Sequence, residues 1–67
     1  MKVTYDAKSD TLTVVFKEGA DVAISDDAKP GAILDFDGAG DLVAIEILDA
    51  SRRVSETTRV DFELTNE

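Results

Sequence analysis

The sequence contains no cysteine, no histidine and no tryptophan. Without cysteine, the chain forms no disulfide bond and no thiolate metal site. Without histidine, it lacks the commonest transition-metal ligand and the usual general base of enzymes. We therefore expect a protein that is not an enzyme, has no catalytic residues and carries no cofactor. The lack of cysteine also fits a reducing compartment, so we expect a cytoplasmic location.

Long apolar runs are also missing. No stretch approaches the roughly 20 apolar residues of a membrane-spanning helix, and the first residues do not form a signal peptide. The 67 residues are expected to form one small domain, residues 1–67. A chain of this size buries only about 60% of the surface that its unfolded form exposes. Small proteins of this kind are often stabilised by disulfides, a metal or a partner subunit, and here oligomerisation is the option that remains.

Basic side chains are few: 7 lysines and arginines oppose 15 aspartates and glutamates, a net charge of −8. The excess lies in the middle of the chain, where residues 18–49 hold nine acidic side chains and one basic one, Lys29. Such a field repels a phosphate backbone, so we expect no nucleic-acid binding by the chain alone. A basic protein partner is compatible with it, although plain solubility also accounts for the charge.

Apolar residues recur mostly with a period of two, which indicates strands. Residues 3–5 and 11–17 are predicted to form a hairpin, and residues 22–24 a short strand ended by the polar stretch 25–29. After Pro30 and Gly31, residues 32–37 and 42–48 are predicted to form a second hairpin around a glycine-containing turn. Residues 42–48 are apolar on both faces except for Glu46, which is typical of a central strand.

The C-terminal third gives weaker signals. Asp49 is a candidate N-cap for one short helix near residues 49–55. Val60, Phe62 and Leu64 alternate with acids, which predicts a terminal strand. The expected fold class is therefore mainly β, a small antiparallel sheet of hairpins, with α+β as the variant if the helix forms. Exposed sheet edges favour pairing between chains, and we expect a homodimer.

The stretch from Asp35 to Glu46 nearly matches the calcium loop D-x-[DN]-x-[DN]-G-x5-E. Asp35, Asp37, Gly40 and Glu46 occupy positions 1, 3, 6 and 12, but Ala39 supplies no oxygen at position 5. The flanks alternate as strands rather than helices, and in an extended strand Glu46 lies about 15 Å or more from Gly40. We interpret the stretch as a hairpin turn. The alternative is a weak, adventitious cation site at Asp35, Asp37 and Asp41.

Two further acidic features have structural interpretations. Asp26 and Asp27 beside Lys29 form a carboxylate pair, but consecutive residues of a polar stretch usually point apart into water. Glu46 is the carboxylate with the most apolar neighbours in sequence, and therefore the best candidate for a perturbed pKa. We expect Glu46 either to face solvent or to pair with Arg52 or Arg53.

Three blocks of the sequence resemble a small prokaryotic family known as domain of unknown function 2283. They are the Val3-Thr4-Tyr5-Asp6 strand with the strand that follows it, the Pro30-Gly31 pair with Ile33 to Asp37, and the run from Val43 to Ser51. The resemblance covers residues 1–53 and does not extend into the tail. It implies a compact, soluble protein of bacterial or archaeal type without an established activity. Some members resemble the antitoxin-like member of a gene pair.

Together these features predict a small non-enzymatic module that binds proteins or associates with itself. The alternative is a weak metal- or ligand-binding module that uses the acidic turn at residues 35–41.

Overall fold

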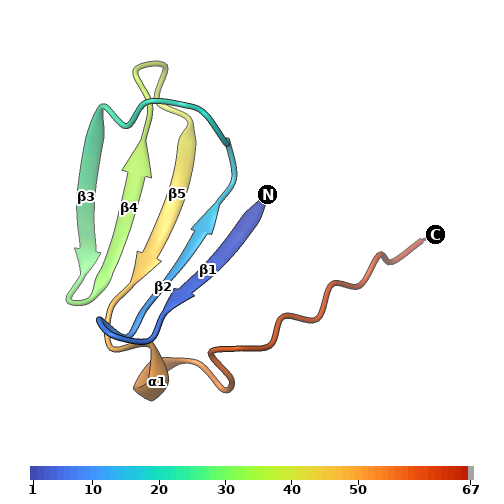
Figure 1. Cartoon of the computed structure of the whole chain (residues 1–67). Helices are drawn as coiled ribbons and strands as arrows, with labels where there is room; N and C mark the ends of the chain where they lie inside the picture. The colour runs from blue at the N-terminus through green and yellow to red at the C-terminus, as the bar shows by residue number, and fades with distance from the viewer. Residues whose placement is uncertain (67) are drawn as a thin grey trace.

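The computed structural model describes residues 1–66. It contains one five-stranded antiparallel sheet with the strand order β1-β2-β5-β4-β3 (Figure 1). This architecture confirms the mainly β class with one short helix. The elements are β1 (Lys2–Asp6), β2 (Thr11–Val15), β3 (Ile24–Lys29), β4 (Ala32–Phe36), β5 (Leu42–Ile47) and α1 (Ala50–Arg53).

Strands β1 and β2 form the first predicted hairpin, with Tyr5 opposite Leu12. Both strands alternate apolar and polar residues, which suits a sheet with two unlike faces. The connecting turn ends at Asp10, whose φ of 53° lies in the left-handed region. Aspartate tolerates this region better than most residues because its short side chain bonds locally.

Strand β5 lies in the centre of the sheet, as its apolar sequence predicted. It pairs with β2 on one side and with β4 on the other. A bulge between Asp35 and Phe36 interrupts the β4–β5 register just before the turn at residues 37–41. Gly40 occupies the left-handed region there, with φ 87°, which a glycine adopts without a steric penalty.

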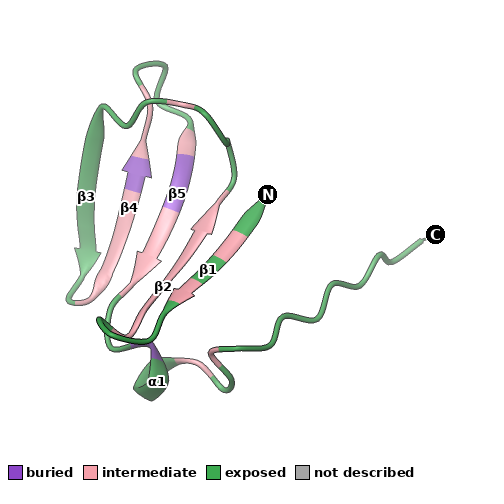
Figure 2. Cartoon of the chain, viewed as in Figure 1, coloured by how far each residue is buried: buried purple, intermediate pink, exposed green. Residues whose placement is uncertain are grey.

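The prediction for residues 22–29 was wrong. The strand is β3, Ile24–Lys29, and it includes the polar stretch that was expected to end it. The turn at Pro30 and Gly31 returns the chain so that β3 pairs with β4 along its length, from Ile24 opposite Phe36 to Lys29 opposite Ala32. All residues of β3 are exposed (Figure 2), so backbone pairing rather than apolar burial holds this edge strand.

The short helix was predicted correctly, and so was Asp49 as its N-cap residue, but the side chain of Asp49 does not cap the helix. Asp49 takes the N-cap position with φ 53° and makes no side-chain cap hydrogen bond. Ala50 is fully buried, and its backbone N–H donates to the Asp10 carbonyl at 2.9 Å. The helix is therefore held against the β1–β2 turn by its backbone. Among residues 1–66, no helix has the length and apolar character needed to cross a membrane.

The predicted terminal strand is absent: after α1, the described chain forms no further regular element. Figure 1 shows this tail running away from the sheet on the β1 side. Val60, Phe62 and Leu64 are exposed at 64%, 80% and 80%. Their alternation suits a strand, but a strand also needs a hydrogen-bonding neighbour, and the tail has none in the described part of the chain.

Candidate interaction surface

The strand registers sort the side chains onto two faces, because directly opposed residues of antiparallel strands point to the same side. One face, called the apolar face below, carries nearly all the large apolar residues of the strands. It consists of Val3, Tyr5, Leu12, Val14, Ile24, Ala32, Leu34, Phe36, Leu42, Ile45 and Ile47, with Asp26 and Lys29 on the edge strand β3. The other face, called the polar face, includes Lys2, Thr4, Thr13, Val15, Ser25, Asp27, Ile33, Asp35, Ala44 and Glu46.

The apolar face has no complete second layer. Within residues 1–66, the buried apolar residues are Val43, Ala44 and Ala50, and no large side chain is fully buried. Most residues of the apolar face are half-buried, and Ile24 is 62% exposed. A sheet with one apolar face normally packs that face against another layer. Here that layer is missing over most of the surface.

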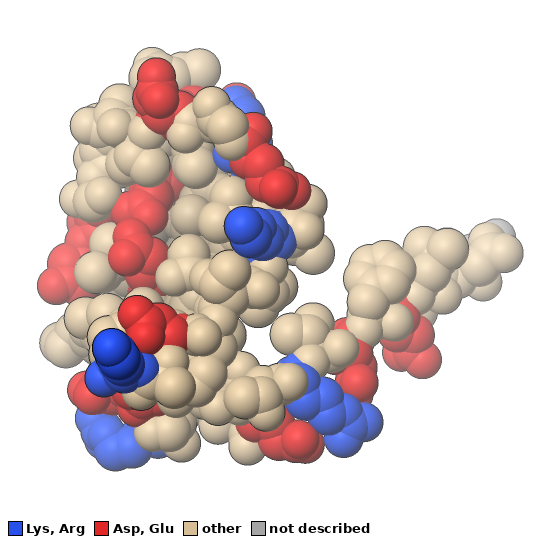
Figure 3. Space-filling model, in the orientation of Figure 1, with Lys and Arg blue, Asp and Glu red and all other residues tan. Residues whose placement is uncertain are grey.

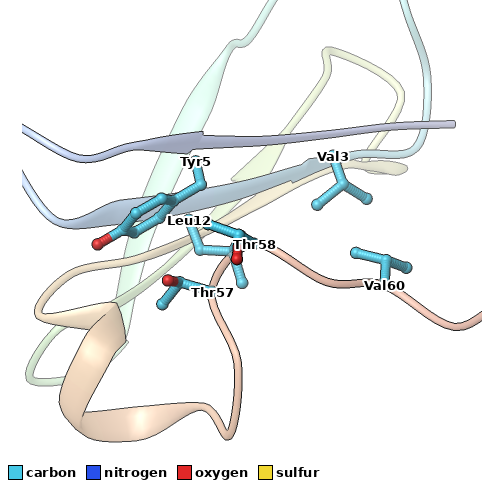
Figure 4. A pocket seen from close by; sticks show the side chains of 6 residues that line it. All are labelled: Val3, Tyr5, Leu12, Thr57, Thr58 and Val60. Atoms are coloured by element: carbon cyan, nitrogen blue, oxygen red, sulfur yellow. The ribbon is translucent and has the colours of Figure 1, made fainter.

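The tail covers only the β1–β2 side of the apolar face. Val3, Tyr5 and Leu12 face the tail residues Thr57, Thr58 and Val60 across a cavity of about 220 Å³ (Figure 4). The cavity walls are mostly apolar, and its tail side is a single extended segment rather than a helix or a sheet. The tail therefore only partly covers this part of the sheet and leaves the β3–β4 side open.

Asp37 and Asp41, two of the three predicted cation ligands, both bind the ammonium group of Lys17. The Asp37 carboxylate also accepts hydrogen bonds from the backbone N–H groups of Ala39 and Asp41, each at 3.0 Å. Lys17 is the main cause that lowers the pKa of Asp37, and Asp37 in turn raises the pKa of Lys17. The cluster explains the acidic turn structurally, because one lysine and two turn amides stabilise its carboxylates.

Asp35, the third predicted ligand, belongs to a different cluster on the polar face. It is buried, and the Ser25 hydroxyl donates to its carboxylate at 2.6 Å. On β5, Ala44 lies directly opposite Asp35, and Glu46 is its diagonal neighbour on the same face. A hydrogen bond with Asp35, and then burial, raise the pKa of Glu46. The sequence suggested a perturbed pKa for Glu46 without a direction, and in the structure this pKa is raised.

Of the two expectations for Glu46, the ion pair with Arg52 or Arg53 does not form, and the solvent-facing position holds only in part, since the side chain is half-buried. Arg52 pairs with Asp49 at 3.3 Å, and Arg53 donates to the Pro30 carbonyl at 2.8 Å. Both arginines follow the end of β5 and lie beyond its last residue. Glu46 is instead flanked across the strands by Thr13 and Ile33, so its charge has no cationic neighbour directly opposite.

The structure does not bring the three predicted cation ligands together. Asp37 and Asp41 share Lys17, whereas Asp35 is engaged with Ser25 and Glu46. No group of three or more acidic side chains within residues 1–66 is arranged to hold a metal ion. Asp26 and Asp27 point to opposite faces of β3, since they oppose Leu34 and Ile33 on β4. Figure 3 shows the few basic side chains of this view separated by acidic and uncharged ones.

Sequence reasoning missed a cluster around Asp10. The hydroxyl groups of Tyr5 and Ser51 each donate to the Asp10 carboxylate at 2.6 Å, and the Ser51 backbone N–H donates at 3.0 Å. The bonds from Ser51, and then from Tyr5, lower the pKa of Asp10. The cluster joins β1, the first turn and α1, which are distant in sequence. The one available signal was that Tyr5 and Ser51 both lie in the blocks that resemble the family.

Comparison with known proteins gives one result. No curated protein and no solved structure matches the chain significantly. The family model described as "Protein of unknown function (DUF2283)" matches residues 2–51, from β1 to α1, and leaves out the tail. Because this match covers the whole sheet and most of the chain, the protein belongs to the DUF2283 family, as the resemblance indicated.

Proposed function

We propose that this chain is a non-enzymatic, self-associating protein-binding module whose contact surface is the apolar face. The observation that carries the proposal is the missing second layer: most of the apolar face is only half-buried, and its β3 end is exposed. Contiguous exposed apolar patches on small proteins mark interaction sites. A second copy of the same chain, related by two-fold symmetry, supplies the missing layer.

The exposed area supports an interface of ordinary size. A folded monomer of 7.2 kDa is expected to expose about 4,100 Å². This chain exposes 5094 Å², an excess of about 1,000 Å² over that expectation. Stable protein–protein interfaces bury about 800 Å² from each partner. Its radius of gyration of 12.9 Å also exceeds the roughly 11 Å of a compact chain of this length.

The charge distribution favours a second copy of the chain as the occupant. Two copies of a chain with net charge −8 repel each other through any acidic surface. The only charged side chains on the apolar face are Asp26 and Lys29, both on β3, so covering this face with another copy brings few charges together. Asp35 and Glu46 lie on the polar face and point away from the contact. In this arrangement the exposed Asp27 on the polar face stays available to a basic protein partner.

Two single-lysine variants test the proposal. Ile24→Lys places a charge on the open end of the apolar face, at a side chain that is 62% exposed and contributes little to folding. Thr4→Lys is the matched control, because it makes the same charge change at an exposed site on the polar face of the opposite edge strand. Sedimentation equilibrium over a range of chain concentrations measures the dimer Kd of each variant.

We expect Ile24→Lys to raise the dimer Kd roughly 100-fold, since each of two symmetric sites loses about 1.5 kcal/mol of apolar burial. Thr4→Lys should leave the Kd within about three-fold of the parent value, because a rim or remote charge contributes little. Equal effects of the two variants would contradict the apolar face as the contact. A monomeric parent chain at all concentrations would refute self-association itself.

A further inference from the structure

We propose that the tail residues 59–66, called the C-terminal arm, cross to the second copy and cover the β3–β4 half of its apolar face. The inference rests on the proposed self-association and adds a segment that carries it. In the described structure the arm is extended and runs beyond the sheet on the β1 side (Figure 1). It also lies outside the residues that match the family model.

The arm has the chemistry of one layer of a sheet–sheet contact. Val60, Phe62 and Leu64 alternate with Asp61 and Glu63, so in an extended chain the three apolar side chains project to one side and the acids to the other. The three apolar side chains are 64–80% exposed. The acidic side remains in water when the apolar side is covered. Beyond Val60, which lines the cavity, the apolar side of the arm lacks a partner, as the open half of the sheet does.

The route of the chain directs the arm away from its own sheet. Thr57, Thr58 and Val60 line the cavity against β1 and β2, so the arm starts at this edge and points outward (Figure 4). To cover its own β3–β4 half, the chain would have to reverse direction. Residues 54–67 contain neither glycine nor proline, the residues that most favour tight reversals. A continuing extended path keeps the arm away from its own β3–β4 half and leaves it free to contact a second copy.

The length of the arm fits a sheet of this width. From Arg59 to Asn66, an extended chain reaches about 23 Å at about 3.3 Å per residue. Five strands spaced about 4.8 Å apart span about 19 Å from the first axis to the last. The arm is long enough to extend over the partner's sheet, and Phe62 falls near its middle.

The half of the partner's apolar face that the arm occupies follows from which half of each face is already covered. The chain's own Thr57, Thr58 and Val60 lie against the β1–β2 half. No segment lies over the β3–β4 half among residues 1–66, and this half holds Ile24, the most exposed apolar residue of the apolar face. With the arms exchanged, each chain covers one half of its own apolar face and one half of its partner's.

Cysteine cross-linking in the full chain tests the exchange, because the native sequence has no cysteine. A Phe62→Cys chain is mixed with an Ile24→Cys chain of different mass and oxidised. The control replaces Ile24→Cys by Asp27→Cys, which lies on the same strand but on the polar face. Two thiols held side by side meet at an effective concentration that is roughly millimolar. At a micromolar chain concentration, the Phe62→Cys and Ile24→Cys pair should therefore cross-link roughly 100-fold faster than the Phe62→Cys and Asp27→Cys control pair.

A chain that carries both Phe62→Cys and Ile24→Cys separates exchange from folding back. A covalent dimer at micromolar chain concentration supports the exchange. A closed monomer would mean that the arm covers its own sheet and would overturn the inference. Equal rates for the Ile24→Cys and Asp27→Cys pairs would overturn it as well, since the arm would then have no preferred face.

Substitutions in the arm distinguish failure of this inference from failure of the proposed function. Phe62→Ser with Leu64→Ser removes the apolar side, and Asp61→Ser with Glu63→Ser is the control on the opposite side of the same arm. We expect the first pair to weaken the dimer roughly 100-fold or more and the control pair not to weaken it. An unchanged dimer Kd in the first pair would refute the arm exchange and leave self-association standing. A monomeric parent chain would refute both.

Discussion

Gly31→Ala tests how the hairpin turn and the short helix are joined. Gly31 has φ +85°, and a Cβ at this position would lie 2.7 Å from the Arg53 Nη2 atom and 2.9 Å from its Cζ atom. The Arg53 guanidinium therefore packs directly on the glycine while it donates to the Pro30 carbonyl at 2.8 Å. Alanine at this position introduces both backbone strain and a clash.

The expected loss in the free energy of unfolding is about 2 kcal/mol. The left-handed backbone costs a non-glycine residue about 1 kcal/mol. Displacing Arg53 loses a hydrogen bond worth about 1 kcal/mol. Gly19→Ala is the matched control, because Gly19 has φ +82° and nothing within 4 Å of a built Cβ. The Gly19→Ala variant should lose only the contribution of the backbone conformation to the free energy of unfolding, about 1 kcal/mol.

A double-mutant cycle with Arg53→Ala isolates the clash. In the Arg53→Ala background, Gly31→Ala should cost only about 1 kcal/mol, which leaves a coupling of about 1 kcal/mol. Urea unfolding at one fixed chain concentration measures each variant, since association changes apparent stability. The reasoning fails if Gly31→Ala and Gly19→Ala cost the same, or if removing Arg53 leaves the cost of Gly31→Ala unchanged.

Two further predictions concern the acidic clusters. Asp35 raises the pKa of Glu46 above its ordinary value of 4.5, so the folded chain holds the proton of the Glu46 carboxyl group more tightly than the unfolded chain does. The stability of the fold therefore decreases as the pH rises from 4.5 through the raised pKa. Glu46→Gln should therefore raise the melting temperature at pH 7 but not at pH 4, and a lower value at pH 7 would contradict the assignment. Lys17 occupies the cation position between Asp37 and Asp41. Millimolar calcium should therefore leave the amide NMR signals of Ala39 and Asp41 unshifted in the parent chain and shift them weakly in the Lys17→Ala variant. Larger shifts in the parent chain than in the variant would contradict this interpretation.

The sequence predicted the elements whose apolar pattern decides their structure. β1, β2, β4 and β5 each alternate or are apolar throughout, and their burial in the sheet follows from that pattern. β3 was missed in its polar part because its pairing depends on the Pro30–Gly31 turn and on backbone bonds to β4, not on its side chains. The strand predicted in the tail does not form, because the alternation of Val60, Phe62 and Leu64 shows only which side chains share a face. A strand also needs a neighbouring strand with which to pair.

In the candidate site, too, the sequence predicted local features but not the contacts between residues distant in sequence. The acidic turn was recognised, but Lys17 lies about 20 residues before it in sequence, and only the return of β5 beside β2 brings them together. The cluster at Asp10 likewise joins residues 41 positions apart. The apolar face could be derived from the period of two, whereas its missing second layer could not. Alternation shows which residues share a face but not what packs against it.

The central claim is that a second copy covers the apolar face. Isotope-filtered NMR on a mixture of labelled and unlabelled chains detects contacts between copies directly. The account predicts intermolecular signals to the methyl groups of Ile24, Leu34 and Ile45, and none to Ala44 or Ile33 on the polar face. Intermolecular contacts confined to the polar face, or none at concentrations where the parent chain sediments as a dimer, would contradict it.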